Sequence, residues 1–192
     1  MCIRDSSYTR INNPTVESFE KRVTMLEDGI GSVACASGMA ALTNAFLNIL
    51  QAGDEIVAAC GLYGGTVELF DDLKPFGISV KYVKENKPEA FEAEITEKTR
   101  LVFAETIGNP KLDVTDIQAV AEVAHKHDVP LIVDNTVATP YLIQPLKLGA
   151  DIVVHSSSKY INGSSDAISG ILVCGKGCLL YTSPSPRDRT RS

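Results

Sequence analysis

Residues 151–160 read Asp-Ile-Val-Val-His-Ser-Ser-Ser-Lys-Tyr, an apolar run that ends in three hydroxyls and a lysine. Such a run predicts a buried strand, because a strand covered on both faces shows no alternation of apolar and polar residues. In an α/β fold, a strand of this kind brings the residues after its C-terminal end to the sheet edge where ligand sites form. The stretch therefore predicts an α/β protein with a polar site at residues 156–159.

The polar end of this strand carries side chains that fit a phosphate and an aldehyde. Small hydroxyls at residues 156–158 can hold a phosphate, and the amine of Lys159 can form a Schiff base with an aldehyde. The alternative is structural, since a lysine in a surface loop covers apolar surface with its alkyl chain and keeps its ammonium in water. The strand alone leaves both interpretations open.

The rest of the chain alternates helical and strand patterns, which is typical of an α/β layer architecture. Apolar residues at helical intervals indicate helices at residues 14–28, from about 38 to 49 and from about 115 to 124. Short apolar runs indicate strands at residues 32–36, 55–59, 80–83, 101–104 and 131–133. We expect a mostly parallel sheet covered by helices, since near-continuous apolar strands are buried on both faces.

Capping signals predict where two of these helices begin and end. Asn13 and Pro14 predict the N-cap and first turn of the first helix, and Gly29 predicts its end. Thr115 and Gln118 have the spacing of a capping box and predict the start of the third helix.

The composition indicates one soluble domain of ordinary size, with 192 residues, 44% hydrophobic and 22% charged. The net charge of −6 argues against a nucleic-acid partner, and no apolar run approaches the roughly 18 residues that span a bilayer. Five scattered cysteines do not indicate a disulfide framework. Cys174 and Cys178 lack the second ligand pair of a zinc site, so we expect no metal and a cytoplasmic location.

The two ends differ in composition from the middle. Residues 178–192 shift abruptly to Pro, Ser and Arg without apolar periodicity, and residues 1–6 also look foreign to the fold. We expect both to be non-native, adapter-derived tails around a domain at residues 7–177. A natural disordered C-terminus is the other interpretation of the second tail.

Residues 37–41, Ser-Gly-Met-Ala-Ala, open a predicted helix directly after a predicted strand. The N–H groups at such a helix start can hold a phosphate with help from the helix dipole, although small residues there also serve packing. A rival motif overlaps this region, since residues 29–34 fit the dinucleotide pattern G-x-G-x-x-A. It follows a helix and enters a strand, the reverse of the order that a nucleotide-binding module requires.

Three more residues are candidates for a site. Asp134 ends the strand at 131–133, where a buried carboxylate needs a partner, and Tyr63 offers an aromatic face. Asn109 precedes Pro110 after the strand at 101–104. Each has a structural alternative: a turn aspartate, a partly buried tyrosine and an Asn-Pro turn.

Taken in order and spacing, these segments resemble the motifs of the pyridoxal 5′-phosphate (PLP) enzymes of cysteine and methionine metabolism. The resemblance covers roughly residues 7–177 and is carried by Tyr8-Thr9-Arg10, Asn13-Pro14-Thr15, Ser37-Gly38-Met39, Leu62-Tyr63-Gly64-Gly65-Thr66, Glu105-Thr106-Ile107-Gly108-Asn109-Pro110, Asp134-Asn135-Thr136 and His155-Ser156-Ser157-Ser158-Lys159-Tyr160. It implies the large domain of a fold type I PLP-dependent transferase, without the family's small C-terminal domain.

The same resemblance implies a role for each site residue. Lys159 becomes the Schiff-base lysine, Asp134 the partner of the pyridinium nitrogen and Tyr63 the ring-stacking residue, with Lys159 and Tyr63 catalytic. Asn109 is placed near the ring hydroxyl. The cofactor phosphate is assigned to Gly38, Met39, Ser156 and Ser158, together with Tyr8 and Arg10 of a neighbouring subunit. A homodimer within a homotetramer follows from that last assignment.

Within the family, residues 105–112 and 134–141 are similar to O-acetylhomoserine sulfhydrylases. This implies a γ-replacement in which sulfide displaces acetate from O-acetylhomoserine to give homocysteine. Methionine γ-lyase and cystathionine γ-synthase are the alternatives inside the family, and a non-catalytic nucleotide-binding module is the alternative outside it. Residues 162–166, Asn-Gly-Ser-Ser-Asp, depart from the Gly-Gly-His or Asn-Gly-His that often follows the lysine. We expect this chain to bind PLP without turning substrate over, because the arginine that holds the substrate carboxylate belongs to the C-terminal domain.

Overall fold

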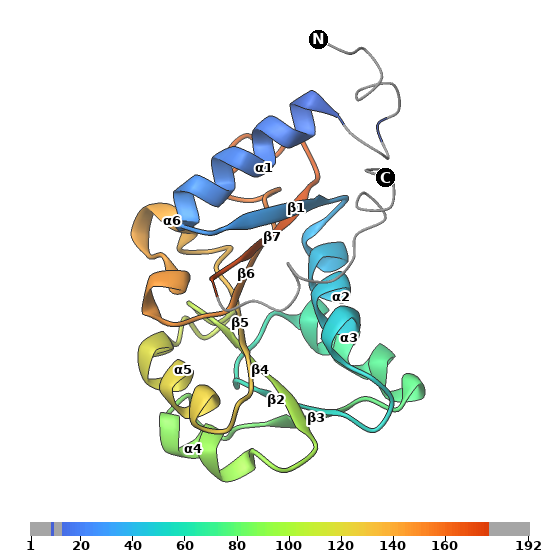
Figure 1. Ribbon diagram of the computed structural model, residues 1–192, viewed down its shortest axis with the longest axis vertical. Coiled ribbons are helices and arrows are strands. Elements are labelled where there is room, and N and C mark those ends of the chain that lie inside the picture. Colours follow the sequence, from blue (N-terminus) through green and yellow to red (C-terminus); the bar gives the residue numbers. More distant parts are fainter. Residues whose placement is uncertain (1–8, 10–12, 177–192) are drawn as a thin grey trace, which may run out of the picture.

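A mixed sheet runs through the part of the chain that the computed structural model describes, which is Thr9 and residues 13–176 (Figure 1). Its strands lie in the order β1-β7-β6-β5-β4-β2-β3. Their bounds are β1 Gly31–Cys35, β2 Glu55–Ala58, β3 Ser79–Tyr82, β4 Thr99–Glu105, β5 Leu131–Asp134, β6 Ile152–His155 and β7 Gly170–Cys174. Residues 1–6 and 178–192, the expected tails, and the expected site residues Tyr8 and Arg10 lie outside the described residues.

The sheet is mostly parallel, as expected. Strands β2 to β6 pair in parallel with their neighbours, while β7 runs antiparallel to both β1 and β6. Strand β1 therefore points in the same direction as the central strands. All of β2, β6 and β7 and nearly all of β4 and β5 are buried, which is the continuous burial that their apolar sequences predict.

Helices cover both faces of the sheet (Figure 1). Helices α2 and α3 lie on one face, and α1, α4 and α5 lie on the other. The bounds are α1 Pro14–Glu27, α2 Gly38–Ile49, α3 Gly64–Leu73, α4 Pro88–Glu94, α5 Ile117–Lys126 and α6 Thr139–Leu142, with short 3-10 turns η2 Lys74–Phe76 and η3 Pro145–Leu148. The chain thus has the layered α/β architecture that its alternating patterns predict.

Aromatic packing fixes α2 and α3 on their face of the sheet. Phe103 of β4 meets Phe46 of α2 and Phe70 of α3 edge-on, with ring centroids 5.4 and 5.7 Å apart. All three side chains are fully buried. Edge-to-face pairs of this kind add to the stability that burial alone supplies, so both helices are held against the sheet through their C-terminal halves.

The predicted cap of α1 is confirmed, and its predicted end is displaced by one residue. Asn13 Oδ1 accepts the N–H groups of Thr15 and Val16 at 2.9 and 3.3 Å. The left-handed position at the other end belongs to Asp28, with φ 60°, and Gly29 follows it. An aspartate tolerates this conformation better than most non-glycine residues.

The capping box predicted at Thr115 and Gln118 is wrong. Asp116 is the N-cap of α5, and its Oδ1 accepts the N–H of Ala119 at 3.1 Å. The hydroxyl of Thr115 donates instead to the carbonyl of Glu105 at 2.8 Å. A buried backbone acceptor at the end of β4 therefore uses the hydroxyl that a cap would need.

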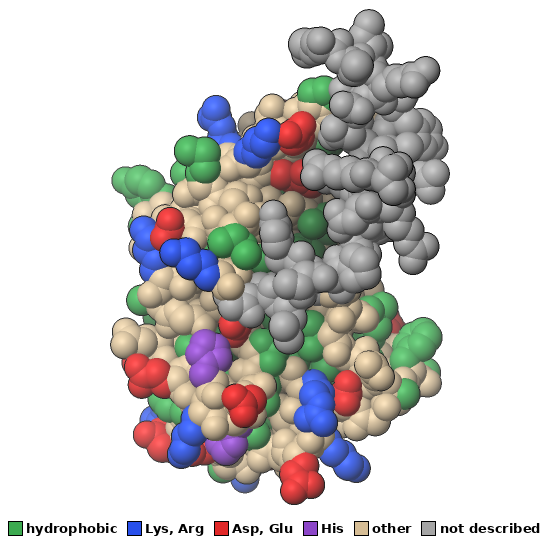
Figure 2. Space-filling view, in the orientation of Figure 1, with side chains coloured by type: hydrophobic (Ala, Val, Ile, Leu, Met, Phe, Trp, Pro, Cys, Tyr) green, Lys and Arg blue, Asp and Glu red, His purple; other side chains and the backbone are tan. Residues whose placement is uncertain are grey.

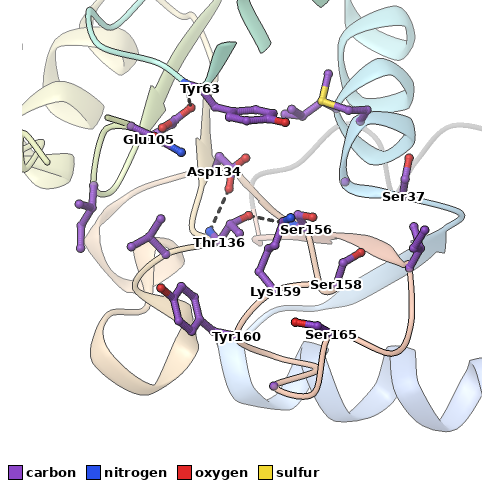
Figure 3. Close-up of a pocket in the computed structure, with 18 residues that line it drawn as sticks. Ser37, Tyr63, Glu105, Asp134, Thr136, Ser156, Ser158, Lys159, Tyr160 and Ser165 are labelled. Carbon is purple, nitrogen blue, oxygen red and sulfur yellow. Dashed lines mark hydrogen bonds between the residues drawn. The ribbon is translucent and has the colours of Figure 1, made fainter. Parts of the chain in front are cut away.

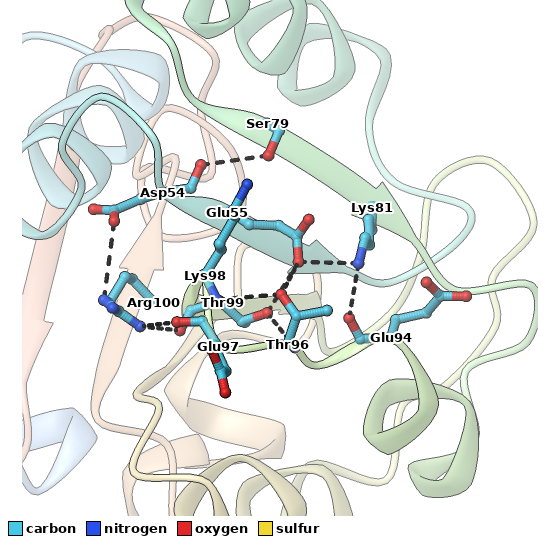
Figure 4. Close-up of polar contacts among 10 residues, drawn as sticks. All are labelled: Asp54, Glu55, Ser79, Lys81, Glu94, Thr96, Glu97, Lys98, Thr99 and Arg100. Atoms are coloured by element: carbon cyan, nitrogen blue, oxygen red, sulfur yellow. Dashed lines mark hydrogen bonds and ion pairs between the residues drawn. The ribbon is translucent and has the colours of Figure 1, made fainter.

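A polar network ties together the N-terminal ends of β2, β3 and β4 (Figure 4). Glu55 Oε1 accepts the hydroxyls of Thr96 and Thr99 at 2.9 and 3.1 Å, and Lys81 Nζ lies 3.2 Å from the same oxygen. The carboxylate of Glu55 is buried, so these partners replace its water. The network lies at the N-terminal ends of these strands, whereas the predicted site follows the C-terminal ends of the strands.

The visible surface carries charges of both signs (Figure 2). Lys and Arg side chains are interspersed with Asp and Glu on this face and do not gather into one basic stripe. Among the described residues, no helix is long and apolar enough to cross a bilayer, and no group of three His, Cys, Asp or Glu could hold a metal ion.

Candidate active site

The C-terminal ends of β1, β2, β4, β5 and β6 meet at one edge of the sheet and surround a cavity of about 670 Å³. This edge is where open α/β sheets bind their ligands. The residues after each strand supply its wall: Ser37 after β1, Tyr63 after β2, Glu105 at the end of β4, Asp134 at the end of β5 and Ser156 after β6 (Figure 3).

Every expected site residue in the described part of the chain lines this cavity. Residues distant in the sequence are brought together there: Gly38, Met39, Tyr63, Asn109, Asp134, Ser156, Ser158 and Lys159. Tyr8 and Arg10, which lie outside the described residues, stay predictions.

The start of α2 forms one end of the cavity. Ser37 Oγ accepts the N–H of Ala40 at 3.1 Å, while the first N–H groups of the helix, at Gly38 and Met39, have no partner within the helix. A Cβ at Gly38 would lie 2.6 Å from the Cβ of Ser156, so only glycine lets the helix start reach the end of β6. The N–H groups of Gly38 and Met39 and the side chain of Ser156 thus lie together, and this arrangement favours the binding of an anion.

Thr136 joins the ends of β5 and β6. Its N–H donates to Asp134 Oδ1 at 2.9 Å, and its hydroxyl accepts the N–H of Ser156 at 2.8 Å (Figure 3). It therefore orients the carboxylate and the serine together. Thr136 belongs to one of the family motifs, but it was not expected as a site residue because its role depends on two strands that are distant in the sequence.

The turn after β6 is tied to the start of β7. Ser158 Oγ donates to the carbonyl of Ser169 at 3.0 Å and accepts the N–H of Ser169 at 2.8 Å. The N–H of Lys159 donates to the carbonyl of Ser156 at 3.1 Å, and the Lys159 side chain lines the cavity. Within residues 13–176 its ammonium forms no ion pair.

Tyr63 directly precedes α3, and its ring lies along the start of that helix. A Cβ at Gly65 would lie 2.6 Å from Tyr63 Cε1, so the ring occupies space that a side chain at 65 would fill. The Tyr63 side chain is half exposed on the cavity wall. Its aromatic face is therefore available to a flat ligand.

Two carboxylates lie side by side at this edge of the sheet. Glu105 and Asp134 are paired residues of the parallel strands β4 and β5. The pKa of Glu105 is raised to about 7: burial raises it most, the N–H of Tyr63 lowers it, the charge of Asp134 raises it, and the N–H of Asn109 lowers it. Burial also raises the pKa of Asp134, against the opposing hydrogen bonds of Thr136 and the influence of His155.

Glu105 was not expected as a site residue. It ends the apolar run at 101–104 just as Asp134 ends the run at 131–133, and that parallel is the signal that could have identified it.

The rival motif at residues 29–34 is a packing feature, because a Cβ at Gly29 would lie 2.5 Å from the Val173 side chain. Its glycines enter β1 at the edge of the sheet opposite the cavity.

The cavity fits a flat ligand with one cationic and one anionic end. Removal from water disfavours the charged form of both Glu105 and Asp134, and a protonated ring nitrogen against Asp134 would stabilise its carboxylate. The start of α2 and Ser156 suit a phosphate, and a lysine amine lies on the wall. Fold and site together define an α/β domain whose cavity is suited to a flat, phosphorylated cofactor.

The comparison with protein families agrees. The model of the family described as Cys/Met metabolism PLP-dependent enzyme matches residues 4–184. The chain therefore belongs to this family, and its cofactor is PLP.

Curated relatives include enzymes of more than one activity. The chain is 51% identical over 169 residues to the O-acetyl-L-homoserine sulfhydrylase of Leptospira meyeri, a match that covers 88% of this chain and 38% of the relative. It is 46% identical over 168 residues to the L-methionine gamma-lyase of Porphyromonas gingivalis, covering 86% of this chain and 42% of the relative. The chain thus spans about two fifths of the length of these relatives.

A solved structure supports the fold and the cofactor. The putative O-acetylhomoserine (thiol)-lyase of Campylobacter jejuni subsp. jejuni NCTC 11168 superposes with a TM-score of 0.86 at 36% identity, covering 94% of this chain and 45% of that chain. That structure contains N′-pyridoxyl-lysine-5′-monophosphate. The expected mostly parallel α/β fold of the PLP enzymes is confirmed.

Proposed function

We propose that the protein represented by this chain catalyses γ-replacement on O-acetylhomoserine. The bond from the γ-carbon to the acetate oxygen breaks, and a bond from the γ-carbon to sulfide sulfur forms, giving homocysteine and acetate. The cavity that gathers Lys159, Asp134 and Tyr63 at the sheet edge carries this proposal. The identity of 51% to an O-acetyl-L-homoserine sulfhydrylase supports the choice of substrate.

Each residue of the cavity would have a separate role in the reaction. When bound, PLP supplies an electron sink for the negative charge that forms on the carbons of the substrate. Asp134 would accept a hydrogen bond from the ring nitrogen and keep it protonated, and Tyr63 would stack on the ring. Lys159 would hold the cofactor through its amine and, once displaced by the substrate amine, carry protons between the α- and γ-side carbons.

The phosphate would lie at the start of α2. The N–H groups of Gly38 and Met39 point there with the positive end of the helix dipole, and Ser156 adds a hydroxyl. Ser158 lines the same wall, but its hydroxyl donates to Ser169, a bond that it would give up to serve the phosphate. Asn109 would lie near the ring hydroxyl.

We further propose a cytoplasmic homodimer, or a tetramer of two such dimers, in which Tyr8 and Arg10 reach the site of the neighbouring subunit. Exposed apolar side chains on α1 and α6 support an interface, since Met25 and Tyr141 are 80% and 92% exposed. Light scattering of the purified protein at several concentrations tests the stoichiometry, and a monomer at every concentration would contradict it.

The first test of the site is borohydride trapping of the purified chain with PLP, followed by peptide mass mapping. We expect a stoichiometric phosphopyridoxyl group on Lys159. Labelling spread over several surface lysines, or none, would contradict the proposed site.

Methionine γ-elimination is the second candidate, favoured by the identity of 46% to an L-methionine gamma-lyase. The full-length enzyme is assayed with O-acetylhomoserine plus sulfide and, separately, with methionine alone. Homocysteine formation as the faster reaction supports γ-replacement. Faster release of a keto acid from methionine would select the lyase instead.

A further inference from the structure

Glu105 is a buried acid of the cavity that has no part in the roles assigned above. Its side chain is 6% exposed and lies at the end of β4, paired in register with Asp134 of β5. Figure 3 shows it next to the backbone of Tyr63, on the same side of the cavity as Asp134. A second carboxylate beside the one that would hold the ring nitrogen calls for an explanation, because like charges at short range oppose each other.

The carboxylate of Glu105 holds two loops of the cavity wall. Its Oε1 accepts the N–H of Tyr63 at 2.8 Å, and the N–H of Asn109 also acts on it. The two loops touch directly as well, since the N–H of Asn109 donates to the carbonyl of Gly61 at 3.0 Å. Glu105 thus lies where the segment before α3 and the segment after β4 meet, and each segment carries one residue expected to contact the cofactor ring.

We propose that Glu105 is a positioning residue whose ionisation is coupled to cofactor binding, so that a cationic ring nitrogen on Asp134 favours the ionised Glu105 that holds Tyr63 and Asn109 in place. This inference rests on the proposed cofactor site. It adds a mechanism by which a cation bound at Asp134 strengthens the contacts of Glu105 with the two loops of the cavity wall.

The electrostatics of the cavity support the coupling. Burial and the charge of Asp134 raise the pKa of Glu105 and the N–H groups of Tyr63 and Asn109 lower it, with a net value of about 7, so we expect this acid to titrate near neutrality in the free protein. A cation bound to Asp134 removes the repulsion and adds attraction, which lowers the pKa of Glu105. The ionised acid then accepts the N–H of Tyr63 in a charge-assisted hydrogen bond, which is stronger than a neutral one, and its charge is also favoured by the nearby N–H of Asn109.

The other ionisable groups around Glu105 do not replace this coupling. Those that line the same cavity are Asp134, Tyr63, Lys159 and Tyr160. Lys111 and Asp113 lie beside Gly61, on the loop after β4. Of all these groups, Asp134 is the one whose charge shifts the pKa of Glu105.

The direct measurement follows the carboxyl carbon of Glu105 by NMR in the full chain labelled with [δ-¹³C]glutamate. The signal is assigned by its loss in Glu105→Gln. We expect a titration midpoint near pH 7 in the free protein, and a midpoint lower by about one pH unit or more with pyridoxine 5′-phosphate, which lacks the aldehyde and cannot bond to Lys159. An unchanged midpoint in a protein that binds this compound would overturn the inference and leave the proposed function standing.

Binding measured against pH gives an independent readout. Linkage requires the affinity for pyridoxine 5′-phosphate to rise about tenfold as pH increases through neutrality, if the midpoint shifts by one unit. Glu105→Gln keeps a side-chain oxygen that can accept the Tyr63 N–H but cannot ionise, so its affinity should change less across the same range. The matched control is Glu55→Gln, at the opposite edge of the sheet, which should behave as the wild type.

Each outcome of this comparison has a clear meaning. Equal pH dependence in the wild type and Glu105→Gln would overturn the coupling. Failure of the wild-type chain to bind PLP or pyridoxine 5′-phosphate at any pH would overturn the proposed cofactor site, and this inference with it.

Discussion

Nε2 of His155 lies 2.6 Å from Oε1 of Glu27, and both side chains are completely buried. Asn135 Nδ2 donates to the same Oε1 at 3.0 Å and also to the carbonyl of Ile143. The network connects the end of α1 to residues that directly precede Ser156 and follow Asp134 in the chain. Helix α1 therefore supports the backbone of the cavity from behind, without touching the ligand itself.

Removal of the Glu27 carboxylate should destabilise the protein strongly. Glu27→Ala leaves His155 and Asn135 buried without their common acceptor, and we expect a loss of about 3–5 kcal/mol in the free energy of unfolding. Glu27→Gln keeps one oxygen and should lose less. Urea unfolding followed by circular dichroism measures both. Lys21→Ala, which removes an exposed ion pair with Glu17, serves as the control and should change little; an equally small effect of Glu27→Ala would refute the structural role.

A substitution at the N-terminal ends of the strands should lower stability without changing cofactor binding. Glu55→Ala removes the acceptor of Thr96 and Thr99 and the partner of Lys81. We expect unfolding to become easier by about 1–3 kcal/mol, while trapping of PLP at Lys159 below the unfolding transition stays stoichiometric. Loss of trapping in a folded variant would show that the two edges of the sheet are coupled.

Replacement of Gly38 should abolish PLP binding. In Gly38→Ala the new Cβ would lie 2.6 Å from the Cβ of Ser156, so either α2 or the end of β6 must move away from the phosphate position. Gly64→Ala is the matched control at the start of α3, because no atom lies within 4 Å of a Cβ there. Fluorescence titration with PLP compares the two variants, and equal affinities would show that the contact at Gly38 is not needed.

The two serines after β6 should have different effects. Ser156→Ala removes a hydroxyl from the cavity wall and should weaken PLP binding about tenfold, which is the size expected for one hydrogen bond to a charged group. Ser158→Ala frees the N–H of Ser169 and removes one of the two donors to its carbonyl, so we expect it to lower the melting temperature as well. Affinity and thermal unfolding of both variants are measured together; a reversed order of affinity losses would mean that Ser158 is the main phosphate contact.

The free protein should lose stability as pH rises from about 4.5 to about 7. The pKa of Glu105 is raised in the folded state from the ordinary 4.5 to about 7, so in this interval the unfolded chain binds fewer protons than the folded one. The gap corresponds to about 3 kcal/mol, fully lost above pH 7. Denaturant unfolding at pH 4.5, 6 and 7.5 tests this against Glu105→Gln, which should show a smaller decline. Equal declines in both proteins would assign the effect to other groups.

Local sequence patterns predicted much of this fold, and they failed where structure depends on distant partners. Strands β1, β2, β4 and β5 were evident because their apolar runs are bounded by turns, and α2 because small residues follow β1. Helix α3 was not expected, since Gly64 and Gly65 resemble a turn, and α4 is too short to show a helical period. The antiparallel strand β7 was also not expected, because both of its partners lie elsewhere in the sequence.

The site residues also differ in whether the local sequence could identify them. Lys159 and Asp134 could be predicted because each follows a buried strand, and the family resemblance then assigned their roles. Thr136 carries no such signal, and Glu105 was not recognised as a site residue although it too ends an apolar run. The first acts only where β5 and β6 end together, and the second acquires its raised pKa only from burial and from the register of β4 with β5.

The position of β7 between β1 and β6 has a consequence for synthesis on the ribosome. Within the described residues β1 pairs only with β7, and Gly31 faces Cys174. These two strands come from opposite ends of the described chain, so their pairing has a very large sequence separation and a high entropic cost of loop closure. The nascent chain can form β2 to β5 early, whereas β1 must wait, unpaired, until residue 174 has left the exit tunnel. We therefore expect the phosphate end of the cavity, which begins at the end of β1, to be the last part of the site to be assembled.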